Sequence, residues 1–304
     1  MIYGLAAAVA WGASAIAATY AARRAGTFIT VLVGQGIGMI VLIVLLAAVR
    51  PSFSNMDGTA TWGLLGCGVI GLAGYLSFYR ALELGPVGLV SAIGAAYGGV
   101  TALLAFAILG ERLAPAGTAG LTMAVLGVTL AAARSQGARE PASLAAGEPI
   151  VGVAPAPSAS AAVAAARAGI PFALVSALTY GVGGLLLGHF SARVGWLSAA
   201  LVARVASMAV LVVILPFLGR PSAWRGTASG VVWAAIAGLT DVVGVLAFAR
   251  GGEVGRVAVT AAVSSVYPII PLAAGLALFA ERIGPRQAIG VGLIVVGLVL
   301  LGVA

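Results

Sequence analysis

An internal duplication constrains this chain more than any other feature of its sequence. Residues 80–130 align without a gap on residues 250–300 at a shift of 170 positions. The matched identities include an Arg-x-x-Glu pair, a tyrosine and a Glu-Arg-x-x-Pro sequence, all in register. Two unrelated apolar segments would share Ala, Val and Leu by chance, but not these polar residues, so we infer that one unit occurs twice.

The duplication extends towards the N-terminus at a shift of 169 positions. Trp11-Gly12 aligns with Tyr180-Gly181, and Gly26 aligns with Gly195. Each unit then contains five apolar spans. Because five is an odd number, two consecutive units cross a membrane in opposite senses, which predicts an inverted-topology repeat with its substrate site near the midplane between the halves.

The composition predicts a polytopic membrane protein. The chain is 62% hydrophobic and 8% charged, with a mean hydropathy of +1.16, whereas soluble domains carry about 25% charged residues. A membrane-spanning helix needs roughly 20 apolar residues. We therefore expect an all-α fold with ten transmembrane helices around a central cavity. The expected spans are 2–22, 28–49, 60–82, 86–109, 115–133, 169–190, 197–218, 228–249, 254–279 and 285–303.

Three regions follow from this division. Residues 1–133 form the first five-helix repeat and residues 168–304 the second. Residues 134–167, which are rich in Ala, Pro, Ser and Gly, have the composition of a disordered linker.

The charged residues argue against several classes of protein. All sixteen cations are arginines, giving a net charge of +8. They lie mostly at span ends, as residues at the surface of a lipid bilayer do, and do not form the basic patch that nucleic-acid binding requires. The absence of lysine excludes a phosphate-binding GxxxxGK loop. With one histidine, His189, and one cysteine, Cys67, we expect no enzyme, no metal site and no cofactor.

Three motifs resemble the EamA family of the drug/metabolite transporter superfamily. They are Trp11-Gly12, the Ala-Leu-x-x-Gly-Pro sequence of residues 81–86, and Gly-Glu-Arg-Leu at residues 110–113. The resemblance implies a small-molecule substrate, ten helices in two inverted halves, and a cavity lined mainly by helices one, three, four, six, eight and nine. The family often has a proline just inside helix four; this chain has Gly98 there, and Pro268 in the second copy.

The orientation in the membrane receives conflicting predictions. Five arginines lie on the face that holds the termini and ten on the opposite face, three of the ten in or beside the linker. The positive-inside rule therefore favours termini outside. The family resemblance implies cytoplasmic termini, and we follow the resemblance. The abundance of Ala, Gly and Arg without Lys suggests a bacterial source, hence the inner membrane.

Asp241 and Arg204 are charged residues inside predicted spans. A carboxylate at membrane depth costs roughly 2.5–3.5 kcal/mol on insertion scales, so Asp241 should face protein or water, as a proton-exchanging group or as a structural partner of Arg204. Arg204 either binds a substrate carboxylate, neutralises Asp241 or reaches the headgroups. Its repeat counterpart is Gln35, which is also polar and favours an inward-facing position.

Aromatic residues mark the rest of the predicted substrate site. Tyr75 and Tyr79 lie one turn apart on one face of span three. Under the family resemblance, six aromatic residues fall within or near cavity-lining helices, namely Trp11, Tyr75, Tyr79, Tyr97, Tyr180 and Tyr267. Aromatic walls with few charges suit a neutral, zwitterionic or aromatic metabolite better than a phosphate, which would need several cations.

Two prolines, Pro268 and Pro271, predict a helix break within span nine. Interrupted helices at membrane depth are tolerated where they line a cavity or where neighbouring helices satisfy the freed backbone groups. The repeated pairs Arg80/Glu83 and Arg250/Glu253 lie near span ends at i, i+3 spacing, which favours ion pairs or gate contacts over substrate ligands.

These observations support three functions. The first is a secondary-active exporter of amino acids or similar small metabolites. The second is efflux of organic cations or drugs, which a membrane-embedded glutamate in helix one serves in small four-helix relatives; span one here has no acidic residue. The third is a membrane scaffold or receptor without transport. The sequence also leaves a homodimer open.

Overall fold

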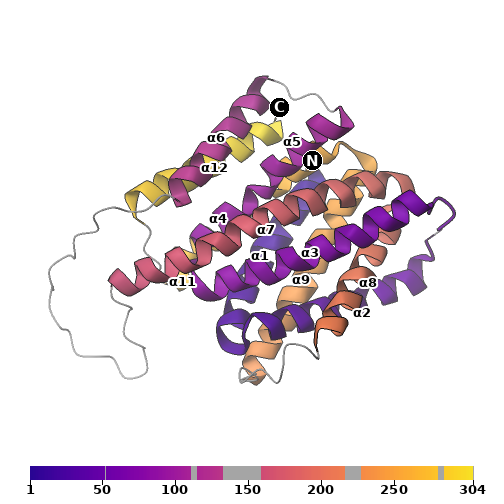
Figure 1. The fold of residues 1–304 in the computed structure, drawn as a ribbon, viewed down its shortest axis with the longest axis horizontal. Coiled ribbons are helices and arrows are strands. Elements are labelled where there is room, and N and C mark those ends of the chain that lie inside the picture. The colour runs from indigo at the N-terminus through magenta and orange to yellow at the C-terminus, as the bar shows by residue number, and fades with distance from the viewer. Residues whose placement is uncertain (52, 111–114, 133–158, 216–226, 280–283, 304) are drawn as a thin grey trace.

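The fold is built from apolar helices, as a computed structural model describes it for residues 1–51, 53–110, 115–132, 159–215, 227–279 and 284–303. Every extended regular element in these ranges is a helix (Figure 1). The helices are α1 (Ile2–Ala25), α2 (Thr27–Val49), α3 (Gly58–Leu84), α4 (Val87–Ala95), α5 (Tyr97–Leu109), α6 (Pro115–Ala132), α7 (Ala159–Val194), α8 (Trp196–Ile214), α9 (Ala228–Val254), α10 (Val257–Ser264), α11 (Ile269–Leu278) and α12 (Pro285–Val303).

Eight segments within the described ranges are long and apolar enough to cross a membrane. Two of them, Val87–Leu109 and Val257–Leu278, are each made of two short helices in line. Outward-facing side chains such as Ile43 on α2 and Val213 on α8 are more than half exposed. Apolar faces on this scale need a partner other than water, and the length of the helices fits a bilayer.

The predicted linker differs from the structure at its C-terminal boundary. Helix α7 begins at Ala159, although residues up to 167 were expected to be disordered. The Ala-rich run from 159 to 168 has high helix propensity and forms the first turns of α7. The remainder of the predicted linker, and the Glu-Arg pairs at 111–112 and 281–282, lie outside the described residues.

The two copies of the repeat begin and end their helices in the same way. Gly26 and Gly195 have φ angles of 83° and 88°, a region that favours glycine. Each is the single residue between two consecutive helices. Asp57 and Thr227 are both N-caps whose side chains accept a hydrogen bond from the backbone three residues on, at 2.7 and 3.2 Å.

The Arg-x-x-Glu motif also has the same role in both copies. Glu83 pairs with Arg80 at 3.0 Å and accepts the backbone N–H of Thr27 at the start of α2. Glu253 pairs with Arg250 at 2.6 Å and accepts the N–H of Trp196 at the start of α8. A carboxylate at a helix N-terminus satisfies otherwise unpaired N–H groups. The predicted ion pairs are therefore present. Their glutamates also link the C-terminal end of α3 to the start of α2 and that of α9 to the start of α8.

Helices from the two copies interleave in the bundle. α1 packs along α9, and its counterpart α7 packs along α3. α2 crosses α9, and its counterpart α8 crosses α3. Figure 1 shows α6 and α12 side by side along one edge of the molecule, and they contact each other directly. The centre of the molecule is thus built from both copies.

The predicted break in span nine is present, and span four has an unpredicted equivalent. α10 ends at Ser264 and α11 begins after Pro268, with Pro271 in its first turn. α4 and α5 meet at Ala96, whose N–H bonds to Ile93 three residues back. The break between α4 and α5 contains no proline. A proline is absent from position 98 because a Cβ there would lie 1.8 Å from Ser265 Oγ and 2.9 Å from a backbone oxygen.

We expect Gly98→Ala to lower the free energy of unfolding by about 1–3 kcal/mol, the usual cost of overpacking a close contact. The measurement is thermal unfolding in detergent, with Gly36→Ala as the control because a Cβ at Gly36 meets nothing within 4 Å. Adding Ser265→Gly to Gly98→Ala should recover part of the loss. An unchanged melting temperature for Gly98→Ala would show that the two breaks do not pack this closely.

Candidate functional site

A cavity of about 140 Å³ lies at the centre of the bundle. A single water molecule needs at least about 10–15 Å³, so the cavity has room for several waters or a small ligand. Its walls come from α1, α2, α3, α5, α7, α8 and α9, together with Tyr267 between α10 and α11. Both copies of the repeat therefore contribute to one central space.

All eight residues predicted for the substrate site line this cavity: Trp11, Tyr75, Tyr79, Tyr97, Tyr180, Arg204, Asp241 and Tyr267. They come from six different helices and from the turn that precedes α11. Their role in binding a substrate remains a prediction. The two prolines predicted at the helix break, Pro268 and Pro271, follow Tyr267 in sequence and are not in the cavity wall.

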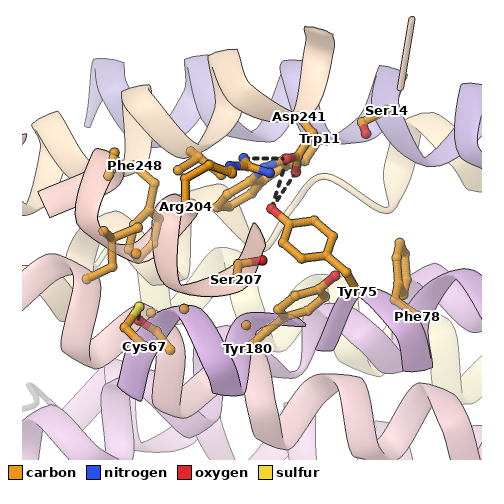
Figure 2. Close-up of a pocket in the computed structure, with 18 of the residues that line it drawn as sticks. Trp11, Ser14, Cys67, Tyr75, Phe78, Tyr180, Arg204, Ser207, Asp241 and Phe248 are labelled. Carbon is orange, nitrogen blue, oxygen red and sulfur yellow. Dashed lines mark hydrogen bonds and ion pairs between the residues drawn. The ribbon is translucent and has the colours of Figure 1, made fainter. Parts of the chain in front are cut away.

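The charged centre of the cavity is a buried ion pair. Arg204 Nη2 lies 3.1 Å from Asp241 Oδ2, and both side chains are less than 10% exposed. The hydroxyl of Tyr75 donates to the two carboxylate oxygens of Asp241 at 2.8 and 3.0 Å. Figure 2 shows these contacts and places Trp11 beside Asp241. Arg204 also donates from Nη1 to Gln35 Oε1, and its guanidinium lies 5.8 Å from the centre of the Tyr75 ring.

The ion pair shows how its two members are placed, while their roles towards a substrate remain predictions. Arg204 does not reach the headgroups; it is turned into the protein and neutralises Asp241. Gln35, its repeat counterpart, occupies the equivalent position on α2 and meets it across the centre. The cavity therefore contains one positive and one negative group, and its net charge is zero.

A close helix contact positions Arg204. A Cβ on Gly38 would lie 3.0 Å from the Arg204 Cζ atom, so the guanidinium packs flat against the backbone of α2. One turn earlier on α2, Gly34 lies against the backbone of Gly238 on α9. Small residues allow helices to approach this closely in membranes. The face of α2 that carries Gly34 and Gly38 thus contacts both α9 and the Arg204 side chain.

Two aromatic residues at equivalent positions pack on two equivalent glycines. Trp11 of α1 lies on Gly244 of α9, where a Cβ would be 2.5 Å from the indole nitrogen. Tyr180 of α7 lies on Gly74 of α3, where a Cβ would be 2.6 Å from the ring. Both aromatic residues are followed by a glycine in sequence, Gly12 or Gly181, against which Ile270 or Val100 packs. The Trp-Gly motif of the first copy and the Tyr-Gly motif of the second therefore form equivalent parts of the cavity wall.

Ring contacts complete this wall. Trp11 meets Tyr97 edge to face at 5.9 Å and Phe248 at 5.6 Å between centroids. Tyr75 meets Tyr180 edge to face at 5.5 Å. Such pairs contribute about 0.5–1.5 kcal/mol beyond the area they bury, which holds the rings in place around the cavity.

Tyr97 and Tyr267, the repeated tyrosines, connect the two interrupted helices. The Tyr97 hydroxyl lies 2.6 Å from the Ser264 hydroxyl at the end of α10. The Tyr267 hydroxyl donates to the Ser91 carbonyl of α4 at 3.1 Å. Each tyrosine thus bonds to the copy of the repeat to which it does not belong.

Sequence reasoning missed several residues of the cavity wall. Gln35 was noted only as the counterpart of Arg204, and Ser14, Cys67, Phe78, Ser207 and Phe248 were not assigned to the site, although all line the cavity. Ser207 follows Arg204 by almost one turn, and this spacing could have revealed it. Among the described residues, no three His, Cys, Asp or Glu side chains are grouped closely enough to hold a metal ion.

The fold and the central cavity define a multi-pass membrane protein. A model of the EamA-like transporter family matches residues 1–133 and 167–303, which is most of the chain. The protein therefore belongs to the EamA-like transporter family. The match covers the two predicted repeats and skips the region between them.

A solved crystal structure has a similar fold. It aligns with 98% of this chain and 94% of its own, with a TM-score of 0.64 and 23% sequence identity. A similarity at this level shows the fold alone. A search of curated proteins finds no significant match.

Proposed function

We propose that this protein is a secondary-active transporter that exports amino acids or similar small, zwitterionic metabolites. Its two five-helix halves are inserted in opposite senses and give access to the central cavity from each side of the membrane in turn. The cavity between the halves, with its paired charges and aromatic wall, is the observation that carries this proposal. The proposed location is the bacterial inner membrane, with both termini in the cytoplasm.

The repeated contacts support two equivalent halves. The packing of Trp11 on Gly244 recurs as that of Tyr180 on Gly74. The contact of α1 with α9 recurs as that of α7 with α3. Since each half has five spans, the second half begins on the opposite side of the membrane. Two halves related in this way can exchange their conformations, which is the physical basis of alternating access.

The charge balance of the cavity supports a zwitterion. A lone carboxylate or ammonium would leave an unbalanced charge in a space of low dielectric constant, which is costly. A zwitterion brings both charges, one for Arg204 and one for Asp241. The aromatic wall then accommodates an apolar side chain. A phosphorylated substrate would need several cations, and Arg204 is the only cationic residue among those that line the cavity.

Efflux of organic cations is the weaker candidate. A cation without a carboxylate of its own would add an uncompensated positive charge to a cavity in which Arg204 already neutralises Asp241. A membrane scaffold would not need a central cavity with a buried ion pair. The chain contains no lysine for a nucleotide-binding loop, so we propose that an ion gradient or the gradient of the substrate drives transport.

The test is counterflow of labelled L-amino acids into proteoliposomes that contain the purified protein. We expect uptake above that of empty vesicles for at least one amino acid with an apolar or aromatic side chain. Absence of counterflow for every amino acid, with the protein folded, would contradict the proposal.

Export is tested separately in cells. Cells that overproduce the protein should lose a preloaded labelled amino acid faster than cells that produce the double variant Arg204→Met with Asp241→Leu, in which both members of the ion pair are replaced together. Faster uptake instead of faster loss would identify an importer.

A further inference from the structure

Two polar atoms in the cavity wall have no hydrogen-bond partner. Gln35 is 2% exposed and Ser207 is 4% exposed, and both line the cavity. Gln35 Nε2 and Ser207 Oγ are nevertheless without a partner. Buried polar groups in proteins are almost always bonded, so unpaired groups in a cavity indicate that a ligand satisfies them.

The chemistry of Gln35 determines which kind of ligand group its free amide nitrogen can bind. Arginine can only donate hydrogen bonds, so the Gln35 atom facing Arg204 is the carbonyl oxygen, Oε1. The free end of the amide is therefore its NH₂ group, a donor. A donor beside a guanidinium favours an acceptor that carries negative charge, because such hydrogen bonds are stronger than neutral ones.

Ser207 approaches the same region from the opposite helix. It lies three residues after Arg204 on α8, so the two side chains share a helix face. Its repeat counterpart on α2 is Gly38, whose lack of a side chain lets the Arg204 guanidinium pack against the helix. Figure 2 shows the Ser207 hydroxyl pointing into the space between Tyr75 and Cys67. Its O–H can donate to a ligand.

Asp241 limits what the site accepts. It bonds to Nη2 of Arg204, whereas Gln35 bonds to Nη1, and it already neutralises the guanidinium. A ligand carboxylate at Gln35 and Ser207 therefore adds one negative charge to a neutral cavity. The ligand must compensate with a positive group of its own near Asp241.

We propose that Gln35 Nε2 and Ser207 Oγ form the subsite that recognises the carboxylate of the transported zwitterion, and so select amino acids over their esters and amines. This proposal rests on the proposed function, since it assigns the substrate end that each part of the cavity binds. The two residues determine specificity, and the aromatic wall holds the remainder of the substrate.

The experiment measures inhibition of counterflow in proteoliposomes. The probes are L-phenylalanine, L-leucine and L-threonine, each compared with its methyl ester. Ser207→Ala removes only the hydroxyl, and Gln35→Met removes the NH₂ donor while keeping a side chain of similar volume and leaving the charge of the cavity unchanged. We expect each variant to weaken inhibition by the amino acids about tenfold or more, because the loss of one hydrogen bond to a charged group has this effect. Inhibition by the esters should change less than threefold.

Ser191→Ala is the matched control, because Ser191 is buried and bonds to its own helix away from the cavity. It should leave inhibition by both amino acids and esters unchanged. If the wild type transports an amino acid and the two variants bind it as tightly as the wild type, the subsite is wrong and the proposed function stands. If the wild type transports none of the three amino acids, the proposed function fails for this class and the subsite with it.

Discussion

Arg204→Met is expected to lower the free energy of unfolding by about 3–5 kcal/mol, because it leaves the Asp241 carboxylate buried without its partner. Asp241→Leu should have a similar effect by leaving the guanidinium unpaired. Both side chains of the pair are less than 10% exposed, so water cannot replace the missing charge. Thermal unfolding in detergent, together with the yield of monodisperse protein, measures the loss.

The double variant separates stability from function. Replacing both charges by apolar residues of similar volume is often neutral or stabilising, so Arg204→Met with Asp241→Leu should melt close to the wild type. It should still fail in counterflow of a zwitterion, since the ammonium group loses Asp241 and the carboxylate loses the positive charge of Arg204 beside Gln35. A double variant that transports normally would remove the ion pair from substrate recognition. Single variants as stable as the wild type would contradict the burial of the pair.

Gly68→Ala is expected to cause the second large loss. α8 crosses α3 at this residue, and a Cβ on Gly68 would lie 2.1 Å from the carbonyl oxygen of Ala203. Backbone atoms cannot rotate away as a side chain can, so the two helices must separate. We expect a cost at or above the upper end of the usual overpacking range of about 1–3 kcal/mol. Ala203 precedes Arg204, and the shift should therefore reduce transport as well.

Gly66→Ala is the control on the same helix, because a Cβ there meets nothing within 4 Å. It should be as stable as the wild type and should transport normally, apart from a small gain in helix propensity. The equivalent crossing, Gly238 on Gly34, predicts the same loss for Gly238→Ala. Equal melting temperatures for Gly68→Ala and Gly66→Ala would show that α3 and α8 do not cross in contact.

The helices could be predicted closely because their signal is local. Runs of apolar residues end at glycines, prolines and arginines, and the duplication lets one copy support the other. The break at Ala96 was missed because the first copy has no proline there. Beside this break Gly98 packs against Ser265 of the other half, a contact between segments far apart in the sequence.

The candidate site was predictable where residue type is unusual for a membrane helix. Asp241 and Arg204 were found because charges are rare at that depth, and the tyrosines were found through the repeat and the family resemblance. Gln35 and Ser207 carry no such signal, since single polar residues are common in these helices. Their importance depends on which hydrogen bonds remain unmade once α2 and α8 face the cavity, and a sequence does not contain that information.

The central claim is that two equivalent halves lie in the membrane in opposite senses around one cavity that contains a buried ion pair. Gly58 and Ala228 are the exposed first residues of α3 and α9 and correspond to each other in the repeat. Each is changed to cysteine in a Cys67→Ala background, and intact cells are treated with a membrane-impermeant maleimide before and after permeabilisation. The proposed topology predicts that Ala228→Cys reacts in intact cells and Gly58→Cys reacts only after permeabilisation. Reaction of both cysteines from the same side of the membrane would contradict the inverted arrangement.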